Sequence, residues 1–263
     1  MPQYGSYADL FVANTDRYPS PVIWSYLDSL SELQGKVVGL FDHFVSMGDV
    51  PPTTQGSYGI YRAFTSTGGA IADGNAQGGE VVLSSDGDDE GASIATWPFI
   101  HIANTKGLVG FEARVATSTI TSTKHGFFLG VIDTTGMTAI SPIAADGTLA
   151  NVNFVGFHRL EGDGDAIDCV YKADGITQVT SIADAHVLVV DTFVKLGFWC
   201  DPVTGKLIWV INGVPQATTV AVTAVGTAGP WDVPLGPAFA VLNATATTPG
   251  NSYLDWWKCL QAI

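Results

Sequence analysis

Acidic residues are the first group to test for chemistry, because two carboxylates on one face of a strand can serve as the nucleophile and general acid of a glycosidase. The two groups then lie about 5.5 Å apart, which residues two positions apart on a strand achieve. The sequence holds no Glu-x-Asp-x-Glu pattern, with or without one more residue before the second Glu. Arg114 follows Glu112 at that spacing, and Asp255 has no acidic neighbour there. We therefore predict a same-face ion pair between Glu112 and Arg114, and a protein that is not an enzyme.

Two acidic loops, Asp86–Glu90 and Glu161–Asp165, are the candidate metal sites. Calcium takes roughly six to eight oxygen ligands, and loops of this kind can provide some of them. Neither loop has the spacing of an EF-hand with its terminal Glu. A solvated turn is the simpler interpretation of each loop, so we predict no cofactor. Calcium held beside a sugar-binding site is the alternative.

The histidines and cysteines are scattered along the chain rather than grouped. No HxH, HExxH or CxxC spacing occurs among His43, His101, His125, His158 and His186, or among Cys169, Cys200 and Cys259. Such spacings bring metal ligands together on one helix or hairpin. We therefore predict structural histidines, free buried thiols and no metal site at these positions.

Residues 1–35 differ from the rest of the chain because aromatic rings crowd a polar, proline-containing segment. These rings belong to Tyr4, Tyr7, Phe11, Tyr18, Trp24 and Tyr26. Leucines recur at three-residue steps between Ser25 and Leu33, which predicts a short helix. Two interpretations stay open: the segment packs on its own domain, or it docks on another protein as an arm. For an arm, these rings are the predicted partner-binding residues, because rigid aromatic anchors lose little entropy on binding.

Trp231 joins the predicted partner-binding residues, because the surrounding Gly229–Asp232 reads as a loop. An exposed ring there would contact a neighbouring subunit. The tryptophans on predicted strands are Trp97, Trp199, Trp209, Trp256 and Trp257. Aromatic rings on strands mostly pack in the core, so we expect these side chains to be buried.

Residues 192–214 give the clearest indication of the type of secondary structure in this chain. Apolar residues alternate with others from Val194 to Cys200, which is the period of a half-buried strand. Asp201–Gly205 is a predicted turn, because proline presets φ and glycine accepts a positive φ. Leu207–Ile211 is the return strand, and Asn212-Gly213 is the strongest short signal for a type I′ turn. The sequence therefore predicts antiparallel β structure.

Similar strands separated by short turns continue from Lys36 to the end of the chain. The predicted strands are Val37–Phe44, Tyr58–Phe64, Gly79–Ser84, Ala92–Ile100, Leu108–Ala116, His125–Asp133, Val152–Leu160, Ala166–Ala173, Ile176–Ile182, Thr192–Cys200, Lys206–Ile211, Gln216–Val222, Pro237–Ala244 and Tyr253–Ala262. Many short strands joined by regular turns indicate a β-sandwich or jelly roll. We predict an all-β antiparallel domain over residues 36–263, preceded by an N-terminal extended arm over residues 1–35.

Charge and hydropathy exclude two classes of partner. The formal net charge is −14, whereas binding to a phosphate backbone needs lysine and arginine to release counterions. No run approaches the ~18 apolar residues of a membrane span. The start, MPQYGSYADL, lacks the basic and apolar regions of a secretory signal. We therefore predict a protein made in the cytoplasm that binds neither nucleic acid nor membrane.

The order of these elements resembles a concanavalin A-like lectin/glucanase jelly roll. Phe111–Val115 is similar to a central strand of that fold, and Val194–Phe198 to a later strand. Leu207–Gly213 is similar to the hairpin that follows. Ser252–Trp257 is similar to the closing strand, which returns beside the first one.

A narrower resemblance, over residues 36–262, is to tailed-phage virion proteins built on this jelly roll. It is carried by the order of residues 41–44, 78–83, 88–94, 98–99 and 110–114. The resemblance implies a capsid decoration or cement subunit on the outside of a bacteriophage virion, made in the host cytoplasm. Its partners would be the major capsid protein and copies of itself, as a trimer or dimer. The alternative is a glycan-binding, lectin-like adhesion module on a fibre or tail.

Overall fold

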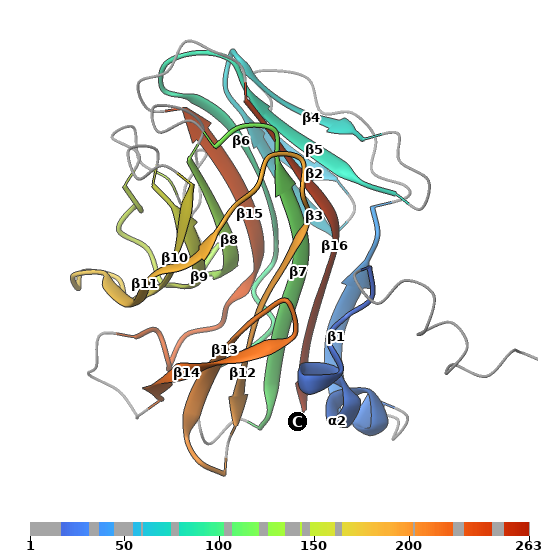
Figure 1. Cartoon of the computed structure of the whole chain (residues 1–263), viewed down its shortest axis with the longest axis vertical. Coiled ribbons are helices and arrows are strands. Elements are labelled where there is room, and N and C mark those ends of the chain that lie inside the picture. The colour runs from blue at the N-terminus through green and yellow to red at the C-terminus, as the bar shows by residue number, and fades with distance from the viewer. Residues whose placement is uncertain are drawn as a thin grey trace, which may run out of the picture.

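The computed structural model describes residues 17–31, 37–44, 55–58, 60–74, 79–102, 107–120, 126–134, 143, 148–160, 165–201, 203–222, 229–243 and 250–262. Two sheets of antiparallel strands lie over each other in this part of the chain (Figure 1). This arrangement confirms the predicted all-β sandwich.

One sheet, here called sheet A, is eight-stranded. Its order is β14 (Val214–Ala221), β13 (Lys206–Ile211), β12 (Val194–Asp201), β7 (Val109–Thr117), β16 (Gly250–Ala262), β5 (Val81–Ser85) and β4 (Gly69–Asp73), with β1 (Val37–Asp42) also beside β16. The β7 strand lies between β12 and β16, as predicted for a central strand. The closing strand β16 pairs with β1, so it returns beside the first strand of the domain, also as predicted.

The second sheet, sheet B, is also eight-stranded. Its order is β11 (Val179–Val187), β10 (Ala166–Lys172), β9 (Phe154–Arg159), β8 (Gly126–Ile132), β15 (Gly236–Asn243), β6 (Glu90–Thr96), β3 (Tyr61–Thr65) and β2 (Gln55–Tyr58). Each strand has an inner face toward sheet A and an outer face, because side chains alternate along a strand.

The core between the sheets is filled by apolar and aromatic side chains of the inner faces. Trp209 packs edge-on against Phe157 at 5.3 Å and against Phe198 at 5.7 Å between ring centroids, which joins the two sheets. Cys169, Cys200 and Cys259 are buried in this core, which confirms the predicted buried thiols. Burial raises the pKa of the Cys200 thiol to about 12, so it stays protonated at neutral pH.

The turns predicted around β13 form as expected. The Asp201 carboxylate accepts hydrogen bonds from Val203 N at 2.9 Å and Thr204 Oγ1 at 2.8 Å. Gly205 has a φ of 61°, so glycine is needed there. Asn212 and Gly213 have φ values of 50° and 78°, which confirms the two-residue turn.

Strand β1 ends in a polar turn, and the Phe44 ring that follows it is buried in the core. Phe44 N donates to Asp42 Oδ1 at 2.7 Å, and Tyr61 donates its hydroxyl proton to the other Asp42 oxygen. The Phe44 backbone is left-handed at a φ of 57°, which is unfavourable for a bulky residue. Its ring is 1% exposed and lies 5.2 Å from the Trp257 ring centroid, so burial offsets that strain.

A helix precedes β1 and lies on the outer face of sheet A (Figure 1). This helix, α2, spans Pro21–Ser31 and begins four residues before the predicted helix. Pro21 occupies the first helical position, where its missing N–H costs nothing. Ile23 N and Trp24 N donate to Ser20 O in the first turn. Within the described residues, no helix has the length and apolar character that crossing a bilayer requires.

The contact of α2 with sheet A decides between the two interpretations of the N-terminal segment for the part that the structure describes. Ile23, Trp24 and Leu27 are at most 2% exposed, and they pack with Leu108 and Val210. Residues 17–27, here called the strap, therefore pack on their own domain. The predicted anchors Tyr4, Tyr7 and Phe11 lie outside the described residues, as does the side chain of Tyr26.

Candidate functional site

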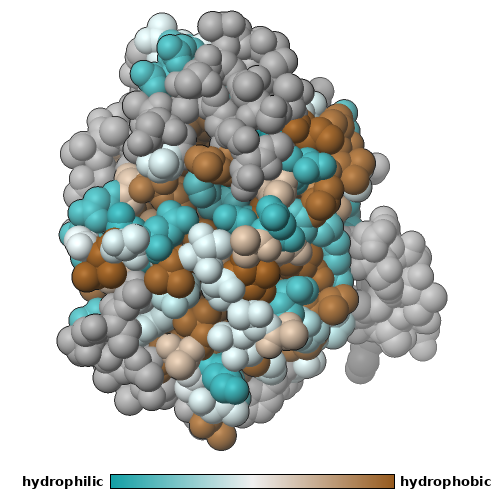
Figure 2. Space-filling model, turned by 60° about the vertical axis from the view of Figure 1, so that its left-hand side comes forward, coloured by the Kyte–Doolittle hydropathy of each residue, from teal (hydrophilic) through white to brown (hydrophobic). Residues whose placement is uncertain are grey.

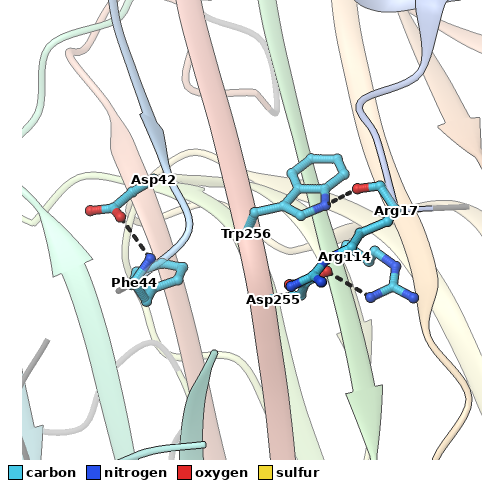
Figure 3. Close-up of polar contacts among 6 residues, drawn as sticks. All are labelled: Arg17, Asp42, Phe44, Arg114, Asp255 and Trp256. Carbon is cyan, nitrogen blue, oxygen red and sulfur yellow. Dashed lines mark hydrogen bonds and ion pairs between the residues drawn. The ribbon is translucent and has the colours of Figure 1, made fainter. Parts of the chain in front are cut away.

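The buried carboxylate of Asp255 is the centre of an ion-pair cluster on the outer face of sheet A (Figure 3). Its side chain is 3% exposed, and its two oxygens accept from Arg17 Nη2 at 2.9 Å and Arg114 Nη1 at 2.6 Å. The register between β16 and β7 shifts between Leu254 and Trp256, and this bulge places Asp255 beside Arg114. Arg17 is also held through its backbone, because Trp256 Nε1 donates to Arg17 O at 2.5 Å.

This cluster corrects one prediction. Arg114 was expected to pair with Glu112. Arg114 pairs instead with Asp255, because the β16 bulge brings that carboxylate next to it. With two guanidinium groups on its oxygens, Asp255 fixes the start of the strap to the sheet.

Glu112 lies beneath the strap rather than in a cleft. Its side chain is fully buried, and Oε2 accepts from Ser20 N at 2.7 Å and Trp24 Nε1 at 2.7 Å. Burial raises the pKa of Glu112, although the hydrogen bonds from Ser20 and Trp24 and the charge of Lys195 oppose this shift. Lys195 Nζ also donates to Tyr18 O at 3.1 Å. Glu112 therefore ties the strap to sheet A, and solvent does not reach it.

Two glycines make room for the strap on the outer face. A Cβ on Gly110 would lie 2.7 Å from Leu27 Cδ1, and a Cβ on Gly197 would lie 2.9 Å from Ile23 Cδ1. Side chains at these positions would therefore displace the helix. Lys258 completes the contact, with Nζ 4.6 Å from the Trp24 ring centroid.

Two of the predicted partner-binding rings are buried. Trp24, on α2, is 2% exposed. Trp231, expected on an exposed loop, is 3% exposed, and its ring centroid lies 5.5 Å from that of Tyr171. The indole folds back over Gly229, where a Cβ would lie 2.0 Å from Trp231 Cζ2. The prediction of an exposed contact at Trp231 is wrong, because the loop packs into the core.

The outer face of sheet B is apolar at its centre. On β9, Val155 and Phe157 belong to the core, so Phe154, Gly156 and His158 alternate outward. Phe154 packs with Phe128, Ile132 and Val170 beneath Ile143 and Leu149, and Phe128 and Phe154 are fully buried. No open cleft is left over this part of β9.

Five strands of this face present no pair of carboxylates for hydrolysis. Along β6, β8, β9, β10 and β15, Asp168 is the one carboxylate at an outward position. It lies across from His158 in the register, and its Oδ1 accepts from Asp184 N at 2.9 Å. Glycoside hydrolysis needs two carboxylates, so these five strands cannot supply that chemistry.

An exposed surface with one aromatic ring, Trp97, lies at the β3–β6 side of sheet B. Trp97 is 56% exposed directly after β6, and Ile60 is 52% exposed directly before β3. Tyr61 pairs with Thr96, so one step further along the two strands Ile60 and Trp97 are neighbours. These two residues, with Arg62 and Phe64, form what we call the Trp97 platform.

The Arg62 guanidinium holds the Trp97 ring of the platform in place. Arg62 Cζ lies 4.8 Å from the Trp97 ring centroid and 5.2 Å from that of Phe64. The guanidinium also donates to the backbone carbonyl of Thr134, so it is fixed in place. Trp97 was predicted to be buried, and that prediction is wrong. The Pro98 that follows ends the strand, and this signal places Trp97 at a strand end rather than in the core.

Comparisons with known proteins give a fold but no family. No protein-family model matches the sequence, and no curated protein matches it. Among solved structures, the carbohydrate recognition domain of Emp47p matches with a TM-score of 0.56 at 9% identity, over 88% of this chain and 99% of that chain. An endo-1,3-beta-glucanase from Streptomyces sioyaensis matches with a TM-score of 0.56 at 12% identity, over 87% and 97%. A protein of unknown function from Shewanella oneidensis MR-1 matches with a TM-score of 0.56 at 11% identity, over 94% and 97%.

The fold is a concanavalin A-like jelly roll. This confirms the fold predicted from the order of the strands. Identities this low establish the fold alone, and the same jelly roll serves a carbohydrate recognition domain and a glucanase. The narrower resemblance to phage virion proteins gains no support from these comparisons.

The predicted calcium loops of this jelly roll are described in part. Asp86 and Glu90 flank the turn after β5, and the pKa of Glu90 is raised, first by desolvation and then by its hydrogen bond with Asp86. Among the residues that the structure describes, no group of three or more His, Cys, Asp or Glu side chains could hold a metal ion. Most of the second loop, residues 161–164, lies outside them. Calcium at these loops stays a prediction.

Proposed function

We propose that this jelly roll binds glycans without hydrolysing them, and that the Trp97 platform is the binding surface. The observation that carries the proposal is the exposed Trp97 ring, 56% exposed with Arg62 supporting it. An aromatic face of this kind can stack on the apolar face of a sugar ring, while the N–H of the indole remains in contact with water. The match to a carbohydrate recognition domain supports the proposal at the level of the fold.

The environment of the carboxylates argues for binding rather than cleavage. A retaining glycosidase needs a nucleophile and an acid that both reach the substrate. Glu112 is fully buried beneath the strap, and both Asp255 oxygens accept from arginines. The outward positions of the five central strands of sheet B hold Asp168 alone. The five central strands of sheet B therefore present no such pair, and the two buried carboxylates of sheet A are held by the strap and by arginines.

The test is glycan-array screening followed by calorimetric titration of the sugars retained. We expect Trp97→Ala to weaken binding by at least about tenfold, which corresponds to about 1.4 kcal/mol. The matched control is Phe41→Ala, because Phe41 is an aromatic residue 47% exposed on β1 of the other sheet. That variant should bind as the wild type does. The same titrations with and without a chelator test the calcium prediction.

Three results would contradict parts of the proposal. An array that retains no glycan rejects glycan binding itself. Sugar binding that Trp97→Ala leaves unchanged rejects the platform as its site. Release of reducing ends from any retained glycan would contradict the non-catalytic part.

Capsid decoration stays a prediction from the sequence resemblance, as do the virion location and the major capsid protein as partner. Its test is co-sedimentation with capsids that lack this protein. Because the strap packs on its own domain, the truncated chain should begin at Arg17 rather than at Lys36. A chain without the strap would lose stability and confuse that test.

A further inference from the structure

The flank of the jelly roll formed by β14 carries an unpaired strand edge. Among the described residues, β14 pairs with β13 on one side and with no strand on the other. Val222 N donates to Gly205 O at 2.8 Å, so this residue's amide points toward β13. Amides alternate in direction along an antiparallel strand, so those of Thr219 and Ala221 point away from the sheet.

The first half of β14 is closed to pairing, whereas the second half is open. Pro215 has no N–H to offer, and the register between β13 and β14 shifts between Ile208 and Val210. Proline and bulges are the usual protection of an edge strand. Neither lies between Thr219 and Ala221, where the pairing with β13 is regular.

This edge lacks the charges that keep edge strands apart. The segment Val214–Ala221 reads VPQATTVA and contains no charged residue, although the chain has a formal net charge of −14. The edge strand of the other sheet, β11, holds Asp184 and His186 instead. A second acidic molecule could therefore approach this chain along β14 with less repulsion than elsewhere.

Exposed valines lie at both ends of β14. Val214 begins β14 and is 61% exposed, and Val203 lies in the turn beside the other end of β14 and is 92% exposed. Figure 2 brings the side of β11 and β14 forward and shows brown apolar groups separated by teal ones.

We propose that two copies of this chain pair antiparallel through the second halves of their β14 strands, which makes one continuous sheet across a two-fold axis. In an isologous contact the same patch serves both partners. An axis near Thr219 would exchange the backbone hydrogen bonds of Thr219 and Ala221 between copies. It would also turn Val214 of one copy toward Val203 of the other. The proposal is independent of glycan binding.

Sedimentation velocity over a range of concentrations tests the proposal. We expect a monomer–dimer equilibrium whose dissociation constant decreases as salt rises, because salt screens repulsion between two acidic chains. Thr219→Lys should weaken the dimer by about tenfold or more, because like charges face each other across the new pair. The matched control is Thr67→Lys, which places the same charge at an exposed position of the turn between β3 and β4, on the opposite side of the sheets from β14, and it should dimerise as the wild type does.

Amide hydrogen exchange on the unmodified chain keeps the test independent of any variant. The Thr219 and Ala221 amides should be protected at high concentration and exchange quickly on dilution. A wild type that stays monomeric, or a Thr219→Lys chain that folds and dimerises normally, overturns the proposal. Protection that is independent of concentration and disappears when residues 1–16 are removed also overturns it, because the edge is then covered by its own chain.

Discussion

The outer faces of the two sheets differ in how they are covered. Sheet A places charged side chains outward and covers them with the strap, so that Glu112 and Asp255 each accept two hydrogen bonds. Sheet B places apolar side chains outward at its centre, and Ile143 and Leu149 pack there. The buried carboxylates of sheet A thus have structural roles, whereas the surface that we propose for ligand binding is the uncharged ring of Trp97 on sheet B.

The strap should contribute more to stability than any other feature of this comparison. Trp24→Ala removes a buried indole and one donor to Glu112, so we expect it to lower the free energy of unfolding by about 3–5 kcal/mol. Urea denaturation measures this change. Trp24→Phe keeps most of the ring and loses the N–H, so its smaller loss separates packing from the hydrogen bond. A loss below about 1 kcal/mol for Trp24→Ala would show that the strap is not part of the core.

Substitution of Asp255 should have the second-largest effect on stability. Asp255→Asn leaves two arginines without their carboxylate, and we expect about 2 kcal/mol of destabilisation, because one of those arginines is partly exposed and breaking a fully buried pair costs about 3–5 kcal/mol. The exposed Asp232→Asn is the control and should change stability little. Equal effects of the two substitutions in denaturation experiments would contradict a special role for the β16 bulge.

Glu112 should make the free energy of unfolding depend on pH. Its pKa is raised in the folded state, so the folded protein binds this proton more tightly than the unfolded chain does. Stability from this group is fully present below the unfolded pKa and is lost as pH rises through the folded pKa. Glu112→Gln should therefore lose less stability than the wild type as pH rises from about 4 to 7. Parallel pH profiles of the two proteins would rule this out.

Trp97 should matter least for folding. Because its ring is 56% exposed, we expect Trp97→Ala to change the free energy of unfolding by at most about 0.5 kcal/mol. Thermal or chemical denaturation of the variant used in the glycan titrations measures this. A large destabilisation would mean that the platform is structural, and any loss of binding would then need another explanation.

Local signals predicted the fold well. The turn at Asp201–Gly205 and the Asn212-Gly213 hairpin formed as their residue types require, because each depends on neighbouring positions. The order of strands around β7 and β16 was also correct. Strand alternation encodes these features directly.

The candidate site was predicted less well, because its contacts join distant parts of the sequence. Arg17 and Asp255 are 238 positions apart, and their pairing depends on a bulge that alternation alone does not reveal. Trp231 was placed outside and Trp97 inside, because each was judged from its predicted element rather than from what packs on it. Both tryptophans have a proline next to them in the sequence, yet Trp97 is exposed and Trp231 is buried, so a neighbouring proline alone does not predict burial.

The docking of the strap sets an order of events during synthesis. The strap packs on β7, β12, β13 and β16, and β16 contains the last residues of the described chain. Residues 17–27 are synthesised before these strands, and their binding surface is complete only when β16 has been made. Trp24 and its apolar neighbours therefore stay uncovered until then. This is the period in which a nascent chain is most open to chaperones and to aggregation.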